Sequence, residues 1–144
     1  MTSTVELKKA HAKALKSVIQ HPFLRDIRQG ALPLEAFFRW LAQDYLFVKD
    51  LFRFQALLLA RAPREDQHVL AKGLLALEAE MSWFEKKALE LGVSLSVPWH
   101  PDAFRYALFL EYLKERGYAY QILALWGLEL VYLEGWSGAL GGPE

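Results

Sequence analysis

Apolar residues recur every three or four positions along most of the chain, which is the spacing of α-helices that bury one face. The most regular run alternates at spacings of four and three through Leu70, Leu74, Leu77, Met81, Phe84, Ala88 and Leu91. Gly92 follows directly, and glycine is the usual residue just past a helix end. The pattern predicts one long helix over residues 64–91.

Prolines, glycines and capping residues divide the remaining apolar pattern into further helices. Ser3 and Glu6 have the spacing of a capping box, so a first helix should begin there. Pro63 should end a long helix, and Asp102 should cap a later one. The expected helices cover residues 3–20, 22–29, 33–62, 64–91, 102–116 and 118–136.

No segment alternates apolar and polar residues as a half-buried strand requires, so the fold class should be all-α. Short connections between the helices favour antiparallel neighbours. The length of 144 residues suits one compact domain, and neither an internal repeat nor a linker divides it. We therefore expect a single helical domain over residues 1–144.

The predicted last helix is apolar nearly all round, which is normal for a helix at the centre of a fold. Its apolar residues are Ile122, Leu125, Trp126, Leu128, Val131, Leu133 and Trp136. Because this helix is the last element of the chain, something else should cover it. A second subunit or a further stretch of chain would both serve.

The composition excludes several classes of protein. Lys plus Arg equals Asp plus Glu at 17 each, without a block of like charge, so neither nucleic acid nor an anionic membrane surface is an expected partner. The absence of cysteine excludes disulfides, thiolate metal ligands and a thiol nucleophile. No signal peptide and no apolar run long enough to span a bilayer is evident, which predicts a cytoplasmic protein.

Two acidic residues, Asp44 and Glu129, interrupt otherwise apolar helix faces. Burial of an unpaired carboxylate is costly, so each should have a partner, hold a proton or take part in chemistry. Neither has Lys or Arg three or four positions away, and desolvation would raise the pKa of each towards neutrality. A structural carboxylate and a catalytic or binding site both remain open.

Tyrosines and one Glu-x-x-His sequence are the other candidates for chemistry. Tyr132 lies one helical turn after Glu129, close enough to share a pocket with it. Tyr106 has helical spacing with apolar residues and is expected to point inward. The single Glu-x-x-His at residues 65–68 lacks the second copy and the extra carboxylates of di-iron bundles, so we expect no metal site.

The segment 21–50 resembles the start of the TenA/THI-4 (thiaminase II) family. The similar features are His21-Pro22-Phe23, the turn Gly30–Pro33, Gln43-Asp44 followed by Tyr45 and Phe47, and the later segments Glu78–Met81 and Pro101–Ala107. The resemblance implies a haem-oxygenase-like up-down helical bundle, C-terminally shortened, that needs no cofactor and forms a homo-oligomer, a dimer or tetramer. Either the protein is a short member of the family or the chain is incomplete.

The resemblance also implies roles for particular residues. Asp44 matches the aspartate that holds the pyrimidine, and Tyr106 matches a pocket tyrosine. Glu129 falls where the nucleophilic cysteine of the family stands, as in a branch that has glutamate there. Phe47 replaces a frequent pocket tyrosine, and Tyr132 is shifted from the tyrosine that usually follows the nucleophile.

The implied function is hydrolysis of an aminopyrimidine or formylaminopyrimidine breakdown product of thiamin. Glu129 would act as general base, while Asp44, Tyr106, Tyr132 and Phe47 bind the ring. The alternative is a non-catalytic pyrimidine-binding or structural remnant of the family. An oxidase on the same bundle is a third possibility, but the sequence lacks the metal ligands or cationic pocket that it needs.

Overall fold

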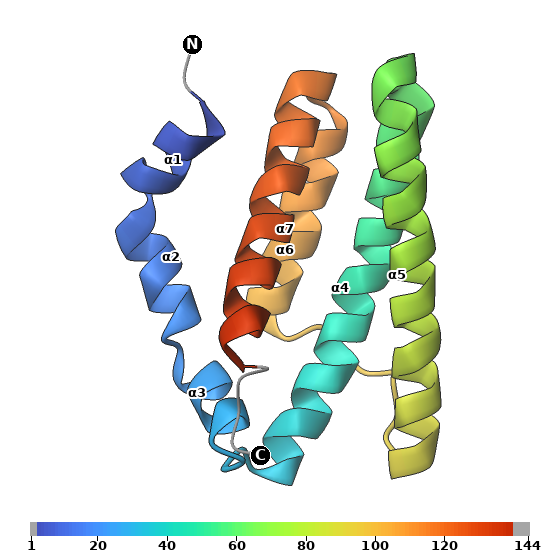
Figure 1. Ribbon diagram of the computed structural model, residues 1–144. Helices are drawn as coiled ribbons and strands as arrows, with labels where there is room; N and C mark the ends of the chain where they lie inside the picture. The colour runs from blue at the N-terminus through green and yellow to red at the C-terminus, as the bar shows by residue number, and fades with distance from the viewer. Residues whose placement is uncertain (1–2, 140–144) are drawn as a thin grey trace. The chain divides into compact units, whose positions relative to one another are not determined.

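The protein is all-helical over the part of the chain that the structure describes. The computed structural model describes residues 3–139, and no strand occurs within that range (Figure 1). The helices are α1 (Thr4–Ala10), α2 (Ala12–Ile19), α3 (Pro22–Arg28), α4 (Leu34–Arg61), α5 (Arg64–Leu91), α6 (Pro101–Lys114) and α7 (Tyr118–Ala139). The predicted fold class is confirmed.

The first predicted helix begins as expected but is divided in two. Ser3 Oγ accepts a hydrogen bond from the Glu6 backbone N–H, and Glu6 Oε2 accepts one from the Ser3 N–H, which completes the predicted capping box. At His11 the backbone departs from helical angles, with φ −109° and ψ 19°. The His11 N–H still donates to Leu7 O, so α1 and α2 are joined at a local bend.

Three helix ends differ from the prediction by two residues or more, and one of them is the end of α6, at Lys114 and not at residue 116. His100, not Asp102, caps α6, because its Nδ1 accepts a hydrogen bond from the Asp102 N–H at 3.2 Å. Pro101 occupies the first helical position, where its lack of an N–H costs nothing, and this places the cap at His100, two residues before Asp102. At the other end α7 continues to Ala139, three residues beyond the predicted end at Trp136.

The helices form two compact units, which we describe separately. Unit 2, Leu34–Leu125, holds α4, α5, α6 and the first part of α7. Within it α4 and α5 lie side by side and antiparallel, joined by residues 62–63 (Figure 1). Its buried core includes Leu41, Val48, Leu51, Phe54 and Leu58 of α4, Leu70, Leu77 and Phe84 of α5, and Leu110 and Leu113 of α6. The expectation of a single domain stays a prediction.

Helices α4 and α6 run in the same direction, because the antiparallel α5 returns the chain to the end of the unit where α4 begins (Figure 1). Near the start of α6, the Gln43 side chain bonds to the backbone of Pro98 and His100. At the far end, Arg61 Nη1 donates to Lys114 O at 3.1 Å. Hydrogen bonds therefore join α4 to α6 or its leading loop at both ends of their contact.

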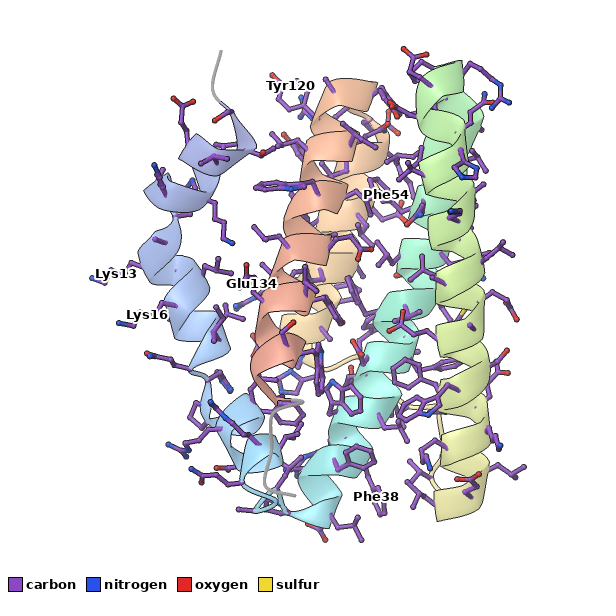
Figure 2. All side chains as sticks on the ribbon, viewed as in Figure 1. Lys13, Lys16, Phe38, Phe54, Tyr120 and Glu134 are labelled. Carbon is purple, nitrogen blue, oxygen red and sulfur yellow. The ribbon has the colours of Figure 1, made fainter. Side chains whose placement is uncertain are left out.

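Unit 1 consists of α1, α2, α3 and α7 from Trp126 onward. Lys8 of α1 forms an ion pair with Glu134 of α7, and Figure 2 shows Glu134 on the side of α7 that faces α1 and α2. Phe23 of α3 and Trp136 of α7 make an edge-to-face ring contact with centroids 6.4 Å apart. Lys13 and Lys16 point away from α7 (Figure 2). An ion pair and an aromatic contact thus hold this unit together.

Helix α7 has an apolar surface that the described residues do not fully cover, as its composition predicted. Leu133 keeps 66% of its surface exposed and Leu123 keeps 43%. None of the helices between residues 3 and 139 combines the length and the apolar character needed to cross a membrane.

Candidate ligand site

Helices α4 and α6 bring three of the five predicted site residues into one region of unit 2. Phe47 is only 7% exposed, and its ring lies against the Tyr106 ring with centroids 5.6 Å apart and planes at 64°. Asp44 is half-buried and precedes Phe47 by three residues, which places both on neighbouring positions of the α4 surface. An aromatic pair beside a carboxylate can hold a flat ring that carries hydrogen-bond donors.

The expectation that Tyr106 points inward is wrong. Tyr106 is 50% exposed, although its helical spacing with Leu110 and Leu113, which are buried, predicted an inward orientation. This position leaves part of the ring free for a ligand while the contact with Phe47 holds it.

Gln43 is a residue that sequence reasoning missed. The sequence drew attention to it only as part of the Gln43-Asp44 pair, yet its Nε2 donates to Pro98 O at 2.9 Å and its Oε1 accepts from the His100 N–H at 2.8 Å. The helical pattern contains no signal for this role, since both partners lie in an irregular loop more than 50 positions away.

Tyr45 and Glu85 form a second polar contact within unit 2. The Tyr45 hydroxyl donates to Glu85 Oε1 at 2.6 Å, which joins α4 to α5. This hydrogen bond, together with burial and the negative charges of Glu85 and Glu78, raises the pKa of Tyr45 to about 12. Tyr45 therefore stays a neutral donor at physiological pH and holds α5 against the helix that carries Asp44.

The other two predicted residues, Glu129 and Tyr132, lie on α7 in unit 1. Glu129 is an exposed residue of α7, and no ion pair of Glu129 occurs among residues 3–139. Partial burial raises the pKa of its carboxyl group above the ordinary value. Tyr132 is half-buried and follows one turn later. Glu129 thus has the character of a proton acceptor with raised basicity.

Within the Glu-x-x-His sequence at residues 65–68, Asp66 has a structural role. Asp66 accepts a hydrogen bond from the Tyr118 hydroxyl at 2.7 Å, which ties the start of α5 to the start of α7. In the described part of the chain, no three His, Asp or Glu side chains gather as a metal-ligand set.

Comparison with known proteins finds similarity over most of the chain. The model of the TENA/THI-4/PQQC family matches residues 8–134. A soybean (Glycine max) protein named "Probable bifunctional TENA-E protein" is 36% identical over 138 residues, covering 90% of this chain and 60% of its own length. The chain therefore spans about three fifths of that relative.

A solved structure gives the same result for the fold. A TenA homologue from Pyrococcus furiosus superposes with a TM-score of 0.93 at 31% sequence identity, covering 98% of this chain and 69% of the other. The helices described above thus follow the haem-oxygenase-like arrangement of that homologue.

Proposed function

The chain belongs to the TENA/THI-4/PQQC family, and from this membership we propose that it is a thiamin-salvage hydrolase acting on an aminopyrimidine or formylaminopyrimidine. The contact of Phe47 with Tyr106 beside Asp44 is the observation that carries the proposal. A flat heteroaromatic ring fits against these aromatic side chains, and its amino group is a donor that a carboxylate accepts.

In the proposed reaction, Asp44 orients the pyrimidine and Glu129 activates water. The Asp44 carboxylate accepts a hydrogen bond from the ring amino group, while Phe47, Tyr106 and Tyr132 contact the ring. Glu129 removes a proton from water as the water oxygen bonds to the carbon of the scissile C–N bond. The protonated Glu129 then returns this proton to the leaving nitrogen as the C–N bond breaks, so the carboxylate is regenerated.

The pKa of Glu129 supports this role. A general base is most effective when its pKa lies near the working pH, and partial burial moves the Glu129 carboxyl group in that direction. A carboxylate is also better suited to proton transfer than to nucleophilic addition here, because it keeps contact with water. Glutamate in place of the nucleophilic cysteine of the family therefore fits base-assisted attack by water.

Family membership also supports the expected cytoplasmic location and homo-oligomeric assembly. The exposed apolar residues of α7, such as Leu133 with 66% exposure, are surface that another subunit could cover. Both remain part of the proposal.

Hydrolysis assays with the aminopyrimidine and its formylated form test the proposal. We expect Glu129→Gln to lower kcat by about 10²- to 10⁴-fold, which is the usual contribution of a general base. Asp44→Asn should mainly raise KM. Glu134→Gln is the matched control, since it removes another α7 carboxylate, which forms a surface ion pair with Lys8. Its activity should stay close to that of the wild type.

Two other outcomes would change the conclusion. Thermal stabilisation by the aminopyrimidine without turnover would favour the non-catalytic pyrimidine-binding protein. If the protein shows no turnover of the aminopyrimidine and is not stabilised by it, the proposal is refuted. If both carboxylates act on one ligand, the double variant should lose less than the product of the two single losses.

A further inference from the structure

We propose that Gln43 is a positioning residue, whose side-chain amide holds the start of α6 and thereby places Tyr106 against Phe47 beside Asp44. The effect on ligand binding rests on the proposed function. The effect on the structure of α6 does not, and the two can be measured separately.

The Gln43 side-chain amide bonds to the loop that leads into α6. It acts as a donor to Pro98 O at 2.9 Å and as an acceptor from the His100 N–H at 2.8 Å, so two hydrogen bonds fix the loop from both sides of residue 99. Gln43 and Phe47 are four residues apart on α4, which puts them on the same side of that helix. One helix face therefore makes both a polar contact with the loop and an aromatic contact with Tyr106.

The position of the loop determines the position of α6. His100 is held through its backbone N–H by Gln43, and its Nδ1 caps α6 by accepting from the Asp102 N–H at 3.2 Å. Pro101 begins the helix, and Tyr106 lies five residues later in the same rigid element. A shift of His100 would therefore move Tyr106 with it. Pro98 and Pro101 restrict the backbone on both sides, so the loop has few alternative paths.

Apolar packing and the contact at the far end of α6 do not set the position of Tyr106 with the same precision. Ala107, Leu110 and Leu113 bury the inner face of α6, but apolar burial is non-directional and tolerates small shifts along a helix. The Arg61–Lys114 hydrogen bond is directional but lies at the far end of α6. Gln43 supplies the directional contact near Tyr106.

Both hydrogen bonds depend on the amide group of the Gln43 side chain. Gln43 donates and accepts at once, whereas a glutamate could accept only, and its charge would face the Pro98 carbonyl oxygen. A methionine of similar length can do neither. Substitutions at this position can therefore remove one or both hydrogen bonds while keeping much of the side-chain volume.

The test compares Gln43→Met and Gln43→Glu with Arg61→Met as the matched control, all in the full chain. Arg61→Met removes the hydrogen bond to Lys114 O at the far end of α6 and keeps an aliphatic side chain. Two properties are measured for each variant: the dissociation constant and kcat/KM for the aminopyrimidine, and amide hydrogen exchange over residues 98–106 and 111–116.

We expect Gln43→Met to weaken aminopyrimidine binding by about tenfold to a hundredfold, because a misplacement of about 1 Å in a site can cost up to about a hundredfold. KM should rise more than kcat falls. Gln43→Glu should show a smaller loss, and Arg61→Met should stay within about twofold of the wild type. Exchange should become faster over residues 98–106 only in the Gln43 variants.

Equal losses of affinity in Gln43→Met and Arg61→Met would overturn the positioning role, because the effect would then be one of general stability. Unchanged affinity and unchanged exchange in Gln43→Met would overturn it as well. If the wild type does not bind the aminopyrimidine, the proposed function fails, and hydrogen exchange alone decides the role of Gln43. Faster exchange confined to residues 98–106 would still support it, and unaltered exchange would refute it.

Discussion

Replacing Gly73 by alanine should destabilise the protein, although alanine is the better helix former. A Cβ atom at Gly73 would lie 2.0 Å from Gln55 Nε2, far inside van der Waals contact. Gln55 is 3% exposed and uses this nitrogen to donate to Leu70 O at 3.0 Å. Its Oε1 atom already lacks a hydrogen-bond partner in the described part of the chain. The Gln55 amide therefore cannot move aside without losing its one hydrogen bond.

The expected change in the free energy of unfolding for Gly73→Ala is the sum of three contributions. Alanine gains about 1 kcal/mol over glycine in a helix interior. Loss of the Gln55 hydrogen bond leaves a buried donor unpaired and costs about 2 kcal/mol. Forcing a methyl group into a packed helix contact costs about 2 kcal/mol more. The net loss is about 3 kcal/mol in the free energy of unfolding, and for a chain of this length the melting temperature should fall by roughly 10 °C.

Urea and thermal unfolding, followed by far-ultraviolet circular dichroism, measure this loss. Gly127→Ala is the matched control, because Gly127 is also inside a helix and a Cβ there meets no atom within 4 Å. That variant should gain stability by about 1 kcal/mol. In a Gln55→Ala background the Gly73→Ala change should become neutral or stabilising. Equal cost in both backgrounds, or a Gly73→Ala protein as stable as the wild type, would refute the reasoning.

Three further predictions concern single titratable or capping groups. The folded protein raises the pKa of the Glu129 carboxyl group. The contribution of Glu129 to stability is therefore present below its unfolded pKa and is lost as pH rises through its folded pKa. Glu129→Gln should accordingly raise the melting temperature near pH 7 and have no effect well below about pH 4. His100→Ala should cost about 0.5–2 kcal/mol in urea unfolding through loss of the α6 cap, whereas His100→Asn should keep most of that stability. Burial and the hydrogen bond to Asp66 raise the pKa of Tyr118 to about 12, so its contribution to stability holds up to about pH 10 and disappears above it. Unfolding midpoints measured from about pH 9 upward should therefore fall less in Tyr118→Phe than in the wild type.

Sequence reasoning identified several site residues but not their arrangement. Asp44 was identified because it interrupts an apolar helix face, whereas Phe47 was identified only through the family resemblance. The contact of Phe47 with Tyr106 and the exposure of Tyr106 were not predicted, since they depend on which edge of α6 meets α4. The assignment of Glu129 as a base stays a prediction.

The sequence by itself determined the elements of this protein. Apolar spacing, the Ser3–Glu6 capping box and the glycine at position 92 act within a few residues of one another, so they predict the helical class and most helix boundaries. Even the wrong cap at Asp102 was an error of two residues, caused by a proline at the first helical position.

Only the tertiary structure decided which side chains carry long-range contacts. Gln43 meets a loop 55 to 57 positions away, and Gln55 lies against the one helix position where glycine leaves room for it. Periodicity shows which face of a helix is buried, but not which residue of another helix lies opposite. That pairing follows from packing of whole helix surfaces, where two residues with the same local pattern can have entirely different neighbours.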